Sequence, residues 1–211
     1  MALYVNLRAA SIGGAVVAPY VIEGDPDADP LAMRSVPWPE VRRRVAGREV
    51  LFGVHGFNVD YAGGARSLGR LSEALELRPS EVFLGVLWPG DAWLPVVNYP
   101  FEGDTAIDCG NRIAGLCGAE LAAARSFSFV SHSLGARLVL QAVSRLERRA
   151  RVVCLTAGAI NDDCLQAEYA GAAVNADSIS LLASHRDEVL KLAFPLGDAI
   201  ADLLHDDHTP F

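Results

Sequence analysis

Short, continuous apolar runs alternate along the chain with longer segments in which apolar residues recur every three or four positions. A continuous run bounded by turn residues is typical of a strand buried on both faces of a parallel sheet, whereas the longer period is typical of a helix. The runs predict strands at residues 49–54, 82–87, 127–130, 152–156 and 178–183, and a leading hairpin of strands at 3–8 and 15–22. The periodic segments predict helices at 61–77, 106–124, from 134 onward, and at 188–204.

This alternation of strands and helices predicts an α/β fold with a mostly parallel sheet, helices on both faces and leading antiparallel strands. The length of 211 residues favours a single domain spanning residues 1–211. Residues 91–105 show no period and are expected to form a long loop, a type of segment that is often functional in compact domains.

The clearest candidate for chemistry is Ser133, which follows the apolar run at 127–130 and precedes a helical pattern. A tight strand-to-helix turn would expose the Ser133 hydroxyl and place the Leu134 N–H at a helix N-terminus. Residues two before and two after the serine must be small in such a turn, and here they are Ser131 and Gly135. The same string would also suit an ordinary N-capped helix.

Polar residues follow several of the predicted strands directly. His55-Gly56, Trp88, Ser133 and Asp187 each come after one of them. Ligands bind outside the carboxyl ends of the strands in sheets of this kind. Acyl transfer through a serine needs two N–H donors for the developing oxyanion, and the N–H groups of Phe57 and Leu134 are the candidates.

Composition and charge limit the classes of binding partner that we expect for this protein. The formal charge is −8 and no basic patch is evident, which disfavours nucleic acid and anionic membranes. No apolar run approaches the roughly 20 residues that span a bilayer. The four cysteines show no metal-binding spacing and suggest reduced thiols in a cytoplasmic protein. We expect neither a metal nor a cofactor.

Three motifs together resemble the α/β-hydrolases. They are Val54-His55-Gly56-Phe57-Asn58, Leu87-Trp88-Pro89 and Ser131-His132-Ser133-Leu134-Gly135, and they are joined by the segment Ser184-His185-Arg186-Asp187. They resemble a poorly characterised branch that pairs an H-G-F-N oxyanion loop with an H-S-x-G nucleophile elbow, and the resemblance runs from about Val50 to the C-terminus. Ser131 stands where the usual G-x-S-x-G elbow has its first glycine.

The resemblance implies roles for residues late in the chain. The family's order of nucleophile, acid and histidine makes Asp187 the acid, with Asp162 and Asp163 as competitors. His205 and His208 come late enough to be the base, and His208 is favoured because His205 looks like a helix end. Neither follows a recognisable strand, so the base could also be missing.

The resemblance therefore implies a serine hydrolase that cleaves carboxylic ester or thioester bonds of a small acyl substrate. Trp88, Trp93, Tyr99 and Phe101 would roof an apolar acyl pocket, or else simply pack in the core. The alternative function is a catalytically degenerate interaction module on the same scaffold. The sequence does not indicate an oligomeric state.

Overall fold

The structure is a computed structural model that describes residues 1–91 and 95–183, with residues 95–103 described by their backbone alone. The strands are β1 Ala2–Arg8, β2 Val16–Gly24, β3 Met33–Val36, β4 Glu49–Val54, β5 Glu81–Leu87, β6 Ser126–His132, β7 Val152–Thr156 and β8 Ile179–Leu182. The helices are α1 Trp38–Val45, α2 Tyr61–Ala74, α3 Pro95–Gly118, α4 Gly135–Arg145 and α5 Ala170–Val174.

The strands form one sheet in the order β3-β2-β1-β5-β4-β6-β7-β8. Strands β1, β5, β4, β6, β7 and β8 are mutually parallel, while β2 and β3 run antiparallel at one edge. The predicted class, a mostly parallel sheet with leading antiparallel strands, is confirmed. The continuous apolar runs became the central strands, because both faces of a parallel strand need apolar cover.

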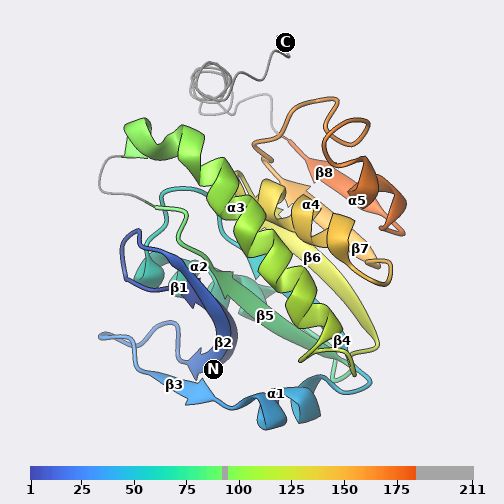
Figure 1. Cartoon of the computed structure of the whole chain (residues 1–211). Coiled ribbons are helices and arrows are strands. Elements are labelled where there is room, and N and C mark those ends of the chain that lie inside the picture. The colour runs from blue at the N-terminus through green and yellow to red at the C-terminus, as the bar shows by residue number, and fades with distance from the viewer. Residues whose placement is uncertain (92–94, 184–211) are drawn as a thin grey trace.

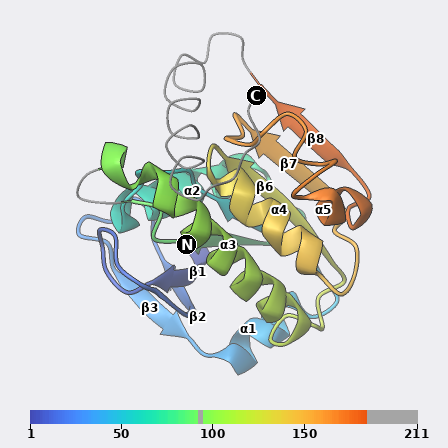
Figure 2. The same cartoon turned by 45° about the horizontal axis from the view of Figure 1, so that its top comes forward.

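Helices cover both faces of the sheet. Helices α3 and α4 lie side by side over one face, and α2 lies behind the sheet in the same view (Figure 1; Figure 2 turns the molecule). The larger core cluster joins Ile113 of α3 and Leu138 of α4 to Phe52 and Phe129 of the sheet. The smaller cluster joins Leu68 of α2 to the other face. Among the described residues, no helix is long and apolar enough to cross a bilayer.

The connections that follow β4 and β6 run to opposite faces of the sheet. These two strands are hydrogen-bonded neighbours, with Val54 level with Ser131. The chain leaves β4 for α2 on one face, and it leaves β6 for α4 on the opposite face. The two connections therefore diverge at the carboxyl ends of the strands, which is where ligands bind in sheets of this kind. His55-Gly56 and Ser133 therefore stand at the same end of neighbouring strands.

Several elements differ from the sequence prediction. The loop expected at residues 91–105 is wrong over much of its length, because α3 begins at Pro95 and continues through residue 105. The short strand β3 and the short helix α5 were not predicted, and α2 ends at Ala74, three residues early. Proline at the first position of a helix loses no hydrogen bond, which explains how α3 can start there.

A buried arginine ties together three loops at the carboxyl end of the sheet. The Arg8 side chain is fully buried and its guanidinium pairs with Asp91 Oδ1 at 2.5 Å. It also donates to four carbonyl oxygens, those of Ala10, Ser11, Val59 and Trp88. These acceptors lie after β1, β4 and β5, so one side chain fixes the relative positions of the segments that follow these strands.

Replacing Arg8 with methionine should lower the free energy of unfolding by about 3–5 kcal/mol, because Asp91 would remain buried without its partner. The matched control is Arg42→Met, which breaks the more exposed ion pair of Arg42 with Glu120 and should cost less than about 1 kcal/mol. Urea unfolding followed by circular dichroism measures both. Equal losses in the two variants would show that the Arg8 network does not hold these loops.

Candidate active site

Ser133 lies at the sharpest turn of the site. Strand β6 ends at His132 and helix α4 begins at Gly135, which leaves only two residues for the change of direction. Ser133 has φ of 50°, in the left-handed region that non-glycine residues rarely adopt. A conformation of this kind costs about 1–3 kcal/mol and persists where the surroundings impose it. The predicted strand–turn–helix is thus present, with the serine at its apex.

Three hydrogen bonds hold Ser133 in this conformation. Its N–H donates to Thr156 O at 3.0 Å, and its carbonyl oxygen accepts from the N–H groups of Ala136 at 3.0 Å and Ala159 at 3.2 Å. Thr156 ends the neighbouring strand β7, and Ala159 lies just beyond it. The backbone of Ser133 is therefore occupied on both sides by the protein, which leaves its side chain as the variable group at the turn.

Gly135 explains why the residue two after the serine must be small. A Cβ atom built on Gly135 would lie 2.6 Å from the carbonyl oxygen of His55, which is too close for any side chain. The glycine therefore lets the start of α4 approach the end of β4. Ser131, two residues before Ser133, is buried, and its hydroxyl has no hydrogen-bond partner among the described residues.

Gly56 brings the second loop against the serine. A Cβ on Gly56 would lie 3.0 Å from the Cβ of Ser133 and 2.9 Å from Nδ1 of His132. The bare backbone of the loop after β4 therefore packs directly beside the Ser133 side chain. The sequence predicted this proximity from the positions of the two motifs after their strands, and the structure brings them together.

The buried His55 ring orients the peptide that follows Gly56. The N–H of Trp88 donates to His55 Nε2 at 3.3 Å, so Nδ1 carries the ring proton and donates to Gly56 O at 2.9 Å. The carbonyl of the Gly56–Phe57 peptide is thereby held toward the ring. Because a trans peptide places N–H and C=O on opposite sides, the Phe57 N–H points the other way.

Trp88 supports this arrangement from the next strand. Its indole is fully buried, stacks on the His55 ring with centroids 5.7 Å apart, and donates from Nε1 to His55 O at 2.9 Å. Of the two roles considered for Trp88, its burial favours core packing over contact with an acyl chain. The sequence indicated that Trp88 lies near the site but gave no sign of its pairing with His55.

An apolar cavity of about 310 Å³ lies beside β6, the strand that leads into the Ser133 turn, on the face of the sheet that α2 covers. Apolar side chains of β4, α2 and β6 form most of its wall, and Gly56, Ser131 and His132 lie at its border with the turn. The lining residues are Val54, His55, Gly56, Val59, Ser67, Leu68, Leu71, Val130, Ser131, His132 and Thr156. This cavity could hold a hydrocarbon group close to Ser133.

The other predicted site residues fall into three groups. Asp187, His208, its alternative His205, and Trp93 lie outside the described residues. Tyr99 and Phe101 belong to α3, within the part described by backbone alone. Asp162 and Asp163, the competing acids, are exposed in the turn after β7.

Two residues near the site escaped the sequence analysis. Arg8 and Asp91 form the buried pair described above, at the ends of β1 and of the loop after β5. Asp91 follows Pro89-Gly90 at the carboxyl end of a strand, which is the same positional signal that pointed to Trp88. Arg8 closes the first strand of the hairpin, and nothing in the local pattern indicates that its charge is buried.

The buried histidine should make stability depend on pH. Burial lowers the pKa of His55 from 6.5 to about 4. Between these values the unfolded chain binds a proton that the folded protein does not, so stability should fall by about 3 kcal/mol as the pH drops from about 6.5 to 4. Urea unfolding between pH 4 and 7 should show this slope in wild type and in His132→Asn, whose ring is exposed, and lose it in His55→Asn. A slope that persists in His55→Asn would contradict the assignment.

Comparison with known proteins places the chain in a family. Residues 39–203 match the family model described as alpha/beta hydrolase of unknown function (DUF900). The match begins in α1 and includes the Gly56 loop, Trp88 and the Ser133 turn. No curated protein matches the chain. Since the model covers more than half of the sequence and the fold agrees with it, the chain belongs to this family of α/β-hydrolases.

Proposed function

We propose that this α/β-hydrolase is a serine esterase that forms an acyl-enzyme on Ser133. The observation that carries the proposal is the strained Ser133, held at φ of 50° beside the bare backbone of Gly56. Positive φ also occurs at Asn58, Glu76 and Ala157, so the conformation alone does not mark a nucleophile. At Ser133 it occurs between a strand and a helix at the carboxyl end of the sheet, where the turn lifts the hydroxyl out of the backbone, as a nucleophile requires.

The proposed reaction proceeds in two steps. The Ser133 hydroxyl gives its proton to a histidine as Oγ attacks the acyl carbon, and the carbonyl oxygen becomes an oxyanion. When the oxyanion collapses, the C–O bond to the alcohol breaks and the alcohol oxygen takes the proton from the imidazolium. Water then attacks the acyl-enzyme by the same route, which releases the acid and restores the Ser133 hydroxyl.

Two backbone N–H groups would stabilise the oxyanion. The Leu134 N–H lies in the first turn before α4, where backbone donors have no partner within the helix. The orientation of the Gly56–Phe57 peptide turns the Phe57 N–H away from the His55 ring. Donors of this kind each contribute about 3–4 kcal/mol to lowering the barrier. His55 is then a positioning residue, because it acts on the reaction only through this peptide.

The assignment of the proton-transfer residues rests on their order in the chain alone. His208 is proposed as the base, with His205 as the alternative, and Asp187 as the acid that orients it. For the substrate, the apolar cavity beside His132 favours an ester with a hydrocarbon group. A thioester would use the same residues in the same steps.

The proposal predicts that Ser133→Ala abolishes esterase activity. Hydrolysis of p-nitrophenyl butyrate by wild type should fall by about 10⁴-fold or more in Ser133→Ala, because the covalent route is lost. The control is Ser144→Ala, which removes a helix hydroxyl that donates to Leu140 O and should change the rate less than about twofold. Equal rates in wild type and Ser133→Ala would end the proposal.

A fluorophosphonate probe separates this function from its rival. An active site should become labelled on Ser133 in wild type and remain unlabelled in Ser133→Ala. If folded wild type is neither labelled nor active, the non-catalytic interaction module becomes the better account of the same scaffold.

A further inference from the structure

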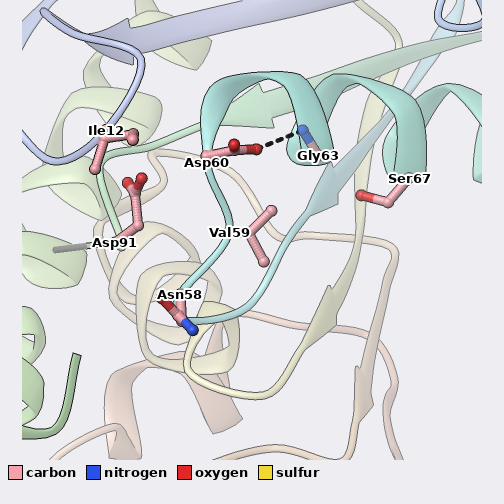
Figure 3. Close-up of a pocket in the computed structure, with 7 residues that line it drawn as sticks. All are labelled: Ile12, Asn58, Val59, Asp60, Gly63, Ser67 and Asp91. Carbon is pink, nitrogen blue, oxygen red and sulfur yellow. Dashed lines mark hydrogen bonds between the residues drawn. The ribbon is translucent and has the colours of Figure 1, made fainter. Parts of the chain in front are cut away.

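A second cavity, of about 510 Å³, lies against the loop that follows β4. Figure 3 shows its wall: Asp60, Gly63 and Ser67 come from the start of α2, and Ile12 comes from the turn between β1 and β2. The lining residues are Ile12, Asn58, Val59, Asp60, Gly63, Ser67 and Asp91. Val59 and Ser67 also line the apolar cavity beside the elbow, so the two cavities adjoin.

Hydrogen bonds hold the walls of this second cavity in place. The Tyr61 N–H donates to Ser11 O at 3.0 Å, which fixes the β1–β2 turn against the start of α2. Asp60 caps α2 by accepting from the Gly63 N–H at 2.7 Å. Arg8 adds bonds to the carbonyls of Ser11 and Val59. The cavity is thus formed before any ligand arrives.

Asp91 presents a buried acceptor in this cavity. The residue is only 4% exposed, and its Oδ1 pairs with Arg8. Its Oδ2 is buried and has no hydrogen-bond partner among the described residues. Figure 3 shows the carboxyl group directed toward Ile12, across the cavity from Asp60. A buried oxygen without a donor costs about 1–3 kcal/mol, so a ligand that supplies the donor gains binding energy.

The charges around the cavity limit the kind of ligand that can donate a hydrogen bond to Asp91 Oδ2. An anion is disfavoured, because the carboxylates of Asp60 and Asp91 both line the cavity. A cation would be attracted by Asp60 alone and repelled by the buried guanidinium of Arg8, which already neutralises Asp91. No group of three potential metal ligands occurs in the part of the chain that the structure describes. A neutral hydroxyl avoids both repulsions, and Asp60 and the Asn58 amide offer further acceptors for neighbouring hydroxyls.

The second cavity lies within reach of Ser133. Gly56 packs against the Ser133 Cβ, and Asn58 at the cavity wall is two residues further along. Two peptide units span at most about 7.6 Å, which places the Asn58 Cα within about 12 Å of the Ser133 Cβ. We propose that this cavity binds a hydroxyl-rich group, a sugar or an open-chain polyol, that forms part of the ester substrate. The link to the substrate rests on the proposed esterase function, whereas the binding itself does not.

A suitable variant must block the cavity and leave the buried ion pair intact. Asp91→Asn would leave Arg8 unpaired in the interior, so its failure to bind could reflect unfolding. Ile12→Trp instead fills the cavity from the turn, where Ile12 is 39% exposed. The matched control is Val174→Trp, at the C-terminal end of α5, where the side chain is 74% exposed and lies outside both cavities.

The test is an NMR titration of the ¹⁵N-labelled full chain. Methyl β-D-glucopyranoside and glycerol serve as the ring and open-chain probes, and 2-methoxytetrahydropyran serves as the analogue without hydroxyl groups. We expect one of the two probes to shift the Gly63 amide and the Asn58 side-chain amide with a millimolar dissociation constant. Ile12→Trp should weaken this binding at least tenfold, Val174→Trp should leave it unchanged, and the analogue should cause no shift.

Three results would overturn the inference: shifts with the analogue equal to those with the probes, binding by Ile12→Trp equal to that of wild type, or no shift with either probe. Water would then be left as the partner of Asp91 Oδ2. Hydrolysis of p-nitrophenyl butyrate by the same samples keeps the two proposals apart. Binding without hydrolysis would retain the hydroxyl site and reject the esterase. Hydrolysis without binding would retain the esterase and reject the hydroxyl site.

Discussion

The structure depends on a close approach of two backbones at the carboxyl end of the sheet. Gly135 lets the start of α4 press against the carbonyl of His55, and Gly56 lets the loop after β4 press against the Ser133 side chain. Both contacts exclude a Cβ atom or leave almost no room for one. They are possible because β4 and β6 are paired in parallel register, so that the two turns begin at the same height. This approach sets the positions of Ser133, the proposed nucleophile, and of the loop proposed to bind the oxyanion.

The residues around this contact restrict the conformation of the backbone. Thr156 and Ala159 hold the strained Ser133 from the side of β7. His55 and Trp88 hold the Gly56 peptide from the side of β5, and the low pKa of His55 keeps its ring neutral, as both of its hydrogen bonds require. Arg8 fixes the outer loops. Electrostatic stabilisation of a transition state needs donors that are already in place, and this shell provides such preorganisation.

The sequence predicted the parts of the fold that follow from burial alone. Continuous apolar runs gave the central strands, and the small residues around Ser133 gave the turn. The start of α3 was missed because Pro95, Pro100 and the scattered aromatic residues conceal any helical period, although Pro95 itself is compatible with the first turn of a helix. The His55–Trp88 pair and the Arg8–Asp91 pair were missed for another reason. They join residues more than 30 positions apart, and no local pattern shows which buried polar groups will meet.

The most direct test of this account is a crystal structure of the wild-type protein after reaction with a phosphonate ester, whose tetrahedral adduct mimics the oxyanion intermediate. The account predicts phosphorus bonded to Ser133 Oγ and the phosphonyl oxygen within about 3 Å of the N–H groups of Phe57 and Leu134. A phosphonyl oxygen directed away from both N–H groups, or an adduct on another residue while Ser133 remains unmodified, would contradict it.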